Sequence, residues 1–117
     1  MAIVDRTQDI LVPYSLDNTF EALKKALQKL GEFKVKRFDE NTKTVYLNVG
    51  VSWLSWGENI IVSLAQAQTG GTSVFILSTP KTGIFLGGAI DFGKNRDNIK
   101  KIEQTLSSEL NNYTQIS

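Results

Sequence analysis

Apolar residues recur at helical spacing near the start of the chain. Successive apolar positions lie four, three, four and three residues apart: Leu16, Phe20, Leu23, Leu27 and Leu30. Such spacing places the side chains along one stripe of a helix. Ser15 or Asp17 suits the N-cap, and Gly31 suits a left-handed stop. The pattern predicts an amphipathic helix over residues 16–30.

Strict alternation replaces this period after Gly31. Successive residues over 33–38, 45–49, 60–65 and 74–77 would point to opposite faces of a strand, with turn residues at 39–43 and 68–72. In the first of these strands Arg37 would share the face of Phe33 and Val35, and Phe38 would lie on the opposite face. Alternation with period two is typical of strands whose two faces differ. A further strand is predicted over residues 9–14, where Pro13 restricts it to a sheet edge or to its own end. We therefore expect five strands.

A second helical pattern closes the chain. Its apolar positions lie three, four, four and three residues apart: Ile99, Ile102, Leu106, Leu110 and Tyr113. This predicts an amphipathic helix from about Lys94 to Asn112.

The order of these elements indicates the architecture. Links between consecutive strands are short enough for hairpins, so the strands pair antiparallel, and two amphipathic helices need an apolar sheet face to cover. We expect an α+β two-layer sandwich in the order β-α-β-β-β-β-α, with a five-stranded antiparallel sheet and two helices on one face. The length of 117 residues fits a single domain, 1–117, with flexible ends at 1–7 and 114–117.

Alternation also divides the strand residues between two faces. The helix-facing set is Phe33, Val35, Val45, Leu47, Val49, Ile60, Val62, Leu64, Val74 and Ile76. The opposite set is Lys34, Lys36, Phe38, Tyr46, Asn48, Ile61, Ser63, Ala65, Phe75 and Leu77. Within the second set, Tyr46, Ile61, Phe75 and Leu77 would form an apolar surface for a ligand or a second subunit. The alternative is that they are scattered exposed hydrophobic residues, which are normal.

The predicted topology resembles the fold class of the TATA-binding protein repeat and, more widely, the helix-grip group of ligand-binding folds. The resemblance is one of element order and carries no DNA-binding residues. The segments Ser55-Trp56-Gly57-Glu58 and Asp91-x-Gly93-Lys94-Asn95 also resemble those of a group of small uncharacterised bacterial domains. That resemblance implies the fold and assigns no activity.

Composition removes several kinds of chemistry. A net charge of +1 gives no field for nucleic acid, and the absence of Cys and His removes thiolate chemistry and the commonest general base and metal ligand. No nucleophile elbow or metal cluster is evident, which leaves Glu58 and Asp91 as the carboxylates worth testing. We expect a cytoplasmic, non-enzymatic protein with no cofactor.

The start of the predicted final helix carries an unusual charge. Basic residues lie near its positive end, together with Gly93 and Asn95: Lys94, Arg96, Lys100 and Lys101. Free amides and basic side chains together form an anion site of the kind that holds phosphate. The alternative is that Asp91 or Asn95 caps the helix while the lysines are solvated.

Two apolar segments complete the candidates. Trp53 and Trp56 lie in residues 51–58, and Phe85 lies in an apolar connection over residues 83–90. Trp56 fits a ligand wall or an interface, and Phe85 with Trp56 could touch a membrane surface; the alternative for both segments is core packing.

Three functions follow for testing. The first is a small-ligand-binding or protein-interaction module using the open sheet face, with a small molecule or a second copy as partner. The second is recognition of an anionic ligand at the final helix, and the third is peripheral membrane contact.

Overall fold

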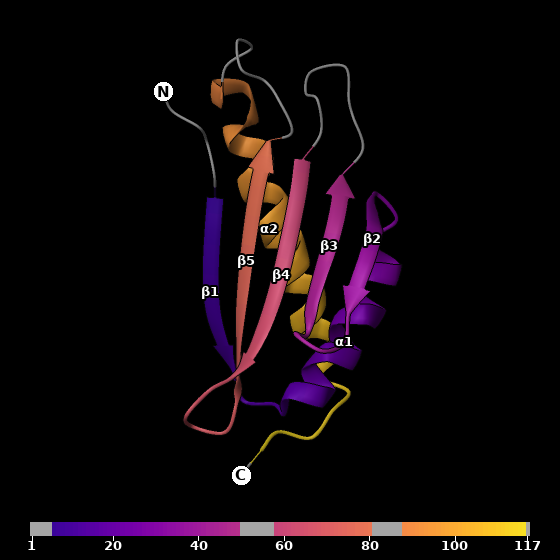
Figure 1. Cartoon of the computed structure of the whole chain (residues 1–117), viewed down its shortest axis with the longest axis vertical. Coiled ribbons are helices and arrows are strands. Elements are labelled where there is room, and N and C mark those ends of the chain that lie inside the picture. Colours follow the sequence, from indigo (N-terminus) through magenta and orange to yellow (C-terminus); the bar gives the residue numbers. More distant parts are fainter. Residues whose placement is uncertain (1–5, 50–57, 81–87, 117) are drawn as a thin grey trace.

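The computed structural model describes residues 6–49, 58–80 and 88–116, and of residues 88–96 it describes the backbone alone. Its elements are β1 (Arg6–Val12), α1 (Leu16–Lys29), β2 (Phe33–Asp39), β3 (Thr44–Val49), β4 (Glu58–Gln66), β5 (Thr72–Pro80) and α2 (Gly88–Leu110). The strands form one sheet in the order β1-β5-β4-β3-β2, and every neighbouring pair is antiparallel (Figure 1). The predicted fold class and element order are confirmed.

Helix α1 begins where the sequence places it. The Ser15 hydroxyl oxygen accepts a hydrogen bond from the Asn18 amide at 3.1 Å, which satisfies one of the free amides of the first turn. The other end differs from the prediction, because the helix ends at Lys29 and Gly31 does not adopt a positive φ. The left-handed stop at Gly31 is therefore wrong; the Leu30 amide instead bonds to the Leu27 carbonyl.

The core lies between the sheet and the two helices, both of which cover the same face (Figure 1). Helix α1 contacts β4 and α2, and α2 contacts β5 and β1. The predicted helix-facing residues are buried, with one exception. Val35 points to this face near the sheet edge and keeps 37% of its surface exposed.

A β-bulge in β2 changes the facing of two residues. The register with β3 shifts between Val35 and Arg37, so Arg37 pairs with Tyr46 and Phe38 with Val45. An extra residue in one strand reverses the alternation beyond it. Phe38 therefore lies on the helix side, where its ring meets Phe20 edge-on at 6.4 Å, and its placement on the open face was wrong.

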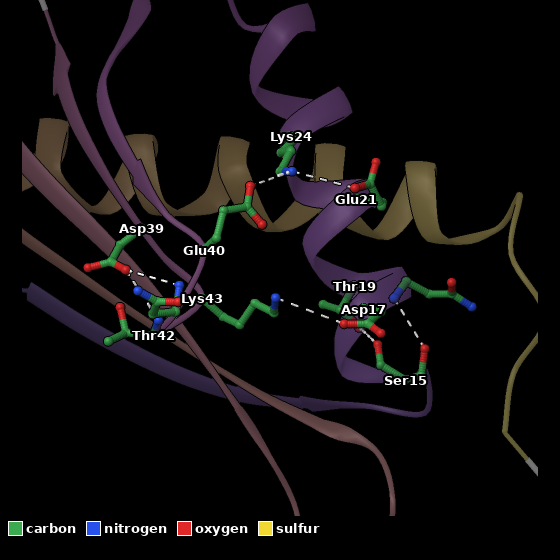
Figure 2. A network of polar contacts seen from close by, with 11 residues as sticks. Ser15, Asp17, Thr19, Glu21, Lys24, Asp39, Glu40, Thr42 and Lys43 are labelled. Atoms are coloured by element: carbon green, nitrogen blue, oxygen red, sulfur yellow. Dashed lines mark hydrogen bonds and ion pairs between the residues drawn. The ribbon is translucent and has the colours of Figure 1, made fainter.

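The turn between β2 and β3 is fastened to α1 (Figure 2). Lys24 bridges Glu21 of its own helix and Glu40 of the turn, at 3.5 and 2.9 Å, and the hydrogen bond that the Lys24 ammonium donates to Glu40 raises the pKa of Lys24. Within the turn, the Asp39 carboxylate accepts hydrogen bonds from the Asn41 and Thr42 amides. These contacts fix the outer end of the hairpin that carries Tyr46.

Helix α2 begins earlier than predicted, at Gly88 rather than about Lys94. Its buried stripe follows the predicted spacing and consists of Ile99, Ile102, Leu106 and Leu110. The carboxylate of Glu109 is also buried and forms an ion pair with Lys29 at the end of α1. This pair joins the C-terminal ends of the two helices.

Described residues near both ends of the chain contact the rest of the fold. Arg6 and Thr7 belong to β1, and the Ile116 amide donates to the Pro13 carbonyl at 3.0 Å. Pro13 directly follows β1, which is an edge strand, as the sequence predicts.

Candidate functional site

The sheet face opposite the helices carries an apolar row across its three central strands. Tyr46 pairs with Ile61, and Ile61 pairs with Leu77, so the three side chains lie side by side on β3, β4 and β5. Directly paired residues point to the same face, with Cβ atoms about 5 Å apart. All three are partly exposed. Alternation in the sequence predicts that the three residues share this face, and the strand registers align them in one row.

A more polar row lies beside it. Thr44 pairs with Ser63, Ser63 with Phe75, and Phe75 with Asp9 of β1. The hydroxyls of Thr44 and Ser63 lie 3.2 Å apart in a hydrogen bond, and the Asp9 carboxylate accepts one from Ser73. Phe75 stands among these polar groups with 38% of its surface exposed. The open face therefore combines exposed aromatic area with fixed hydroxyls.

Arg37 closes one end of the apolar row, because the β2 bulge turns it onto the open face. Its guanidinium lies over the Tyr46 ring, 4.5 Å from the ring centre. A cation over an aromatic face is attracted by the electron-rich ring. Arg37 thus orients Tyr46 and adds a positive charge at the β2 edge of the face.

Asn48 lies one row further along β3, between Lys34 and Asn59. Its side-chain oxygen is shielded from solvent and has no hydrogen-bond partner among the described residues. A buried acceptor without a donor is costly. Asn48 thus brings to the row beyond Tyr46 an acceptor oxygen that no described residue uses.

An apolar hollow adjoins the open face at the end of β1. It has a volume of about 310 Å³, and its lining consists of Leu11, Val12, Pro13, Thr69, Gly71 and Ile116. Leu11 belongs to both regions, since it shares the face of Asp9 and is 58% exposed. The hollow is thus continuous with the open face.

The predicted anion site differs from the expected geometry. The backbone of Asp91, Gly93, Lys94, Asn95 and Arg96 lies inside α2, which begins at Gly88. Only the first four amides of a helix lack an internal partner. The amides of residues 93–97 are therefore not free, and the prediction of a helix-terminal anion site there was wrong in that respect.

A polar hollow of about 290 Å³ lies further along the same helix, lined by Asp97, Asn98, Lys100, Lys101 and Gln104. Lys101 donates to Glu32 at 2.8 Å and holds the pKa of that carboxyl below its usual value. Of the two lysines that line this hollow, Lys101 is therefore engaged in an ion pair.

The remaining candidates lie outside the described residues or show no further chemistry. Trp53, Trp56 and Phe85 fall in segments that the structure does not describe, and of Glu58 only the backbone position at the start of β4 is given. Within the described chain, no group of three or more acidic residues could hold a metal ion. No described helix is both long enough and apolar enough to cross a membrane.

Sequence reasoning missed three features of the open face: Arg37, Leu11 and the Thr44–Ser63 hydroxyl pair. Arg37 was missed because regular alternation from Phe33 and Val35 places it on the helix side, whereas the bulge reverses its facing. Leu11 was predicted to lie in an edge strand, but no sheet face was predicted for its side chain. Thr44 lies between the predicted turn, 39–43, and the predicted strand, 45–49, and the register with Ser63 shows that it belongs to the sheet.

Comparisons with known proteins place the fold. No family model matches the chain, and no curated protein matches it. Similar solved structures include a START superfamily protein from Mycobacterium smegmatis (TM-score 0.68, 8% identity, covering 94% of this chain and 99% of that one). Ara h 8.0201 is also similar (TM-score 0.66, 11% identity, 94% and 99%). The di-domain ARO/CYC protein StfQ of the steffimycin biosynthetic pathway matches at TM-score 0.51 and 10% identity, over 92% of this chain and 49% of that one.

At these identities the likeness establishes the fold, a helix-grip α+β architecture, and no activity. The fold is thus an α+β domain with a partly apolar sheet face that no described helix covers.

Proposed function

We propose that this protein is a non-enzymatic binding module that uses its open sheet face for a small ligand or a protein partner. The observation that carries the proposal is the aligned row of Tyr46, Ile61 and Leu77, with Phe75 exposed beside it. Contiguous exposed apolar area of this kind is typical of interaction sites. The polar groups around the row fix the orientation of whatever binds.

Two features bear on the kind of ligand. An open sheet face is flatter than the concave pockets that enclose small molecules, which favours a partner with an extended apolar surface. The fold supports the small-ligand alternative by analogy, because the helix-grip group contains ligand-binding folds. The hollow at Leu11 would serve that alternative, since its volume of about 310 Å³ suits a small apolar molecule.

The absence of His and Cys supports a non-enzymatic role. Peripheral membrane contact through Phe85 and Trp56 remains a prediction from the sequence.

Replacing Phe75 with lysine tests the surface. We expect binding of the neutral apolar probe N-phenylnaphthylamine to weaken at least about tenfold, because the variant loses the aromatic area and presents a charge. The matched control is Val35→Lys, since Val35 is similarly exposed, at 37% against 38%, but points to the other face. Fluorescence titration measures both variants.

An equal loss of probe affinity in Phe75→Lys and Val35→Lys would contradict the open face as the binding surface. Retention of full affinity by Phe75→Lys would contradict it as well.

A further inference from the structure

The two edges of the sheet differ in how they are protected against pairing with another strand. On β2 a bulge interrupts the strand, and three exposed cations lie in or beside it: Lys34, Lys36 and Arg37. Bulges and edge cations are devices by which proteins prevent edge-to-edge association. The β2 edge is thus unsuited to receive another strand.

The β1 edge has no bulge, and its one basic residue, Arg6, lies at the end of the strand. Its seven residues pair with β5 without a register shift, from Arg6 opposite Ser78 to Val12 opposite Thr72. Between Thr7 and Leu11 the only charged residue is Asp9. In the part of the chain that the structure describes, no backbone hydrogen bond joins residues 6–12 to anything but β5. A regular strand with a free backbone edge is a template for a further strand.

We propose that a second copy of this chain occupies the β1 edge, so that two β1 strands pair antiparallel across a twofold axis. The difference between the two edges favours a second copy as the occupant. A head-to-tail contact would have to use the protected β2 edge, whereas β1 against β1 uses one unprotected edge twice and closes as a dimer. The inference builds on the proposed function, because it names the partner that extends the open face.

Asp9, the single charge between Thr7 and Leu11, selects a register. Directly opposed like charges destabilise antiparallel pairs, so Asp9 should not face its own copy. Placing Gln8 opposite Gln8 of the second copy avoids this and sets each Asp9 carboxylate opposite the hydroxyl of Thr7.

This register joins the two open faces. Within one copy Thr7 pairs with Leu77, and Asp9 pairs with Phe75. Across the axis, Leu77 and Thr7 of one copy therefore continue into Asp9 and Phe75 of the second copy. The binding surface becomes a single face of ten strands to which both copies contribute.

Sedimentation equilibrium of the full chain tests the dimer. We expect a species of twice the 13.0 kDa chain mass that dissociates on dilution. Gln8→Lys places two ammonium groups opposite each other at the axis and should weaken the dimer at least about tenfold. Thr7→Lys, which meets Asp9 of the second copy, should weaken it less, and Lys36→Glu on the far edge should leave it unchanged. Circular dichroism confirms that each variant is folded.

Three outcomes would overturn the inference: a monomer at all concentrations, a dimer indifferent to Gln8→Lys, or a dimer broken by Phe75→Lys instead, which would mean pairing through the faces. The proposed function is tested separately. Loss of probe binding in Phe75→Lys in a monomeric protein would retain the open face and reject the dimer. A dimer that depends on Gln8, but whose probe binding is unchanged by Phe75→Lys, would support the dimer and reject the open face as the binding surface.

Discussion

Replacing Ile76 with lysine is expected to unfold the protein, whereas the same change at the next residue, Leu77, is expected to be tolerated. Ile76 is fully buried, with 0% of its surface exposed, and it points into the core between sheet and helices. An ammonium group there has no charge partner among the described core residues, and such burial costs more than about 4 kcal/mol. Domains of this size are stable by about 5–15 kcal/mol, so little or no folded protein should remain if the stability lies at the lower end.

Leu77 faces the other way. Its side chain is partly exposed beside Ile61, and a lysine there can extend its ammonium into solvent. We expect the free energy of unfolding to change by no more than about 1 kcal/mol. Urea denaturation followed by circular dichroism measures both variants. Similar losses at the two positions would show that Leu77 is part of the core and that the face is not open.

The second large effect is expected at Gly71, in the turn between β4 and β5. A Cβ atom added there would lie 2.4 Å from the backbone oxygen of Val12. That atom belongs to the end of β1 and cannot move without shifting the strand. Gly71→Ala should therefore destabilise the protein by about 1–3 kcal/mol, the usual cost of overpacking.

Gly31 provides the matched control. An added Cβ there meets no atom within 4 Å, and its φ is not in the left-handed region. Gly31→Ala should be neutral or stabilising by up to about 1 kcal/mol, because alanine restricts the unfolded chain. Thermal unfolding of the two variants measures the contrast. A tolerated alanine at Gly71 would mean that the turn does not approach β1 as closely as the structure shows.

The fold was predictable because local patterns agree with one another. The stripe of α1 and its Ser15 cap, the alternation in the strands and the short turns all favour the same topology. The prediction of side-chain facing failed in β2, where one extra residue reverses the alternation of the residues that follow it. In β2 regular alternation ends at the consecutive basic residues Lys36 and Arg37, and the pairing with β3 shows that a bulge there exchanges the faces of Arg37 and Phe38.

The start of α2 was misplaced for a different reason. Glycines and apolar residues lead into the helix from Gly88, and Gly93 lies within it. Glycine is unfavourable inside helices and usually indicates a boundary, so the pattern favoured a start near Lys94. That error produced the expectation of free amides at residues 93–97.

The candidate site was predictable in part. Alternation identified Tyr46, Ile61, Phe75 and Leu77 as outward-facing, because each belongs to an uninterrupted strand. The alignment of Tyr46, Ile61 and Leu77 into one row, with Phe75 beside it, depends on the registers of two strand pairs, β3 with β4 and β4 with β5. Turn geometry and packing determine those registers. Single-strand patterns contain no information on those registers.

Methyl NMR during titration with N-phenylnaphthylamine tests most directly whether the open face is the binding surface. Ile60 and Ile61 are neighbours on β4, and Ile76 and Leu77 are neighbours on β5, with one of each pair buried under the helices and the other on the open face. The account predicts that the methyl signals of Ile61 and Leu77 shift most. Larger shifts at Ile60 and Ile76 would place the ligand between sheet and helices and would contradict it.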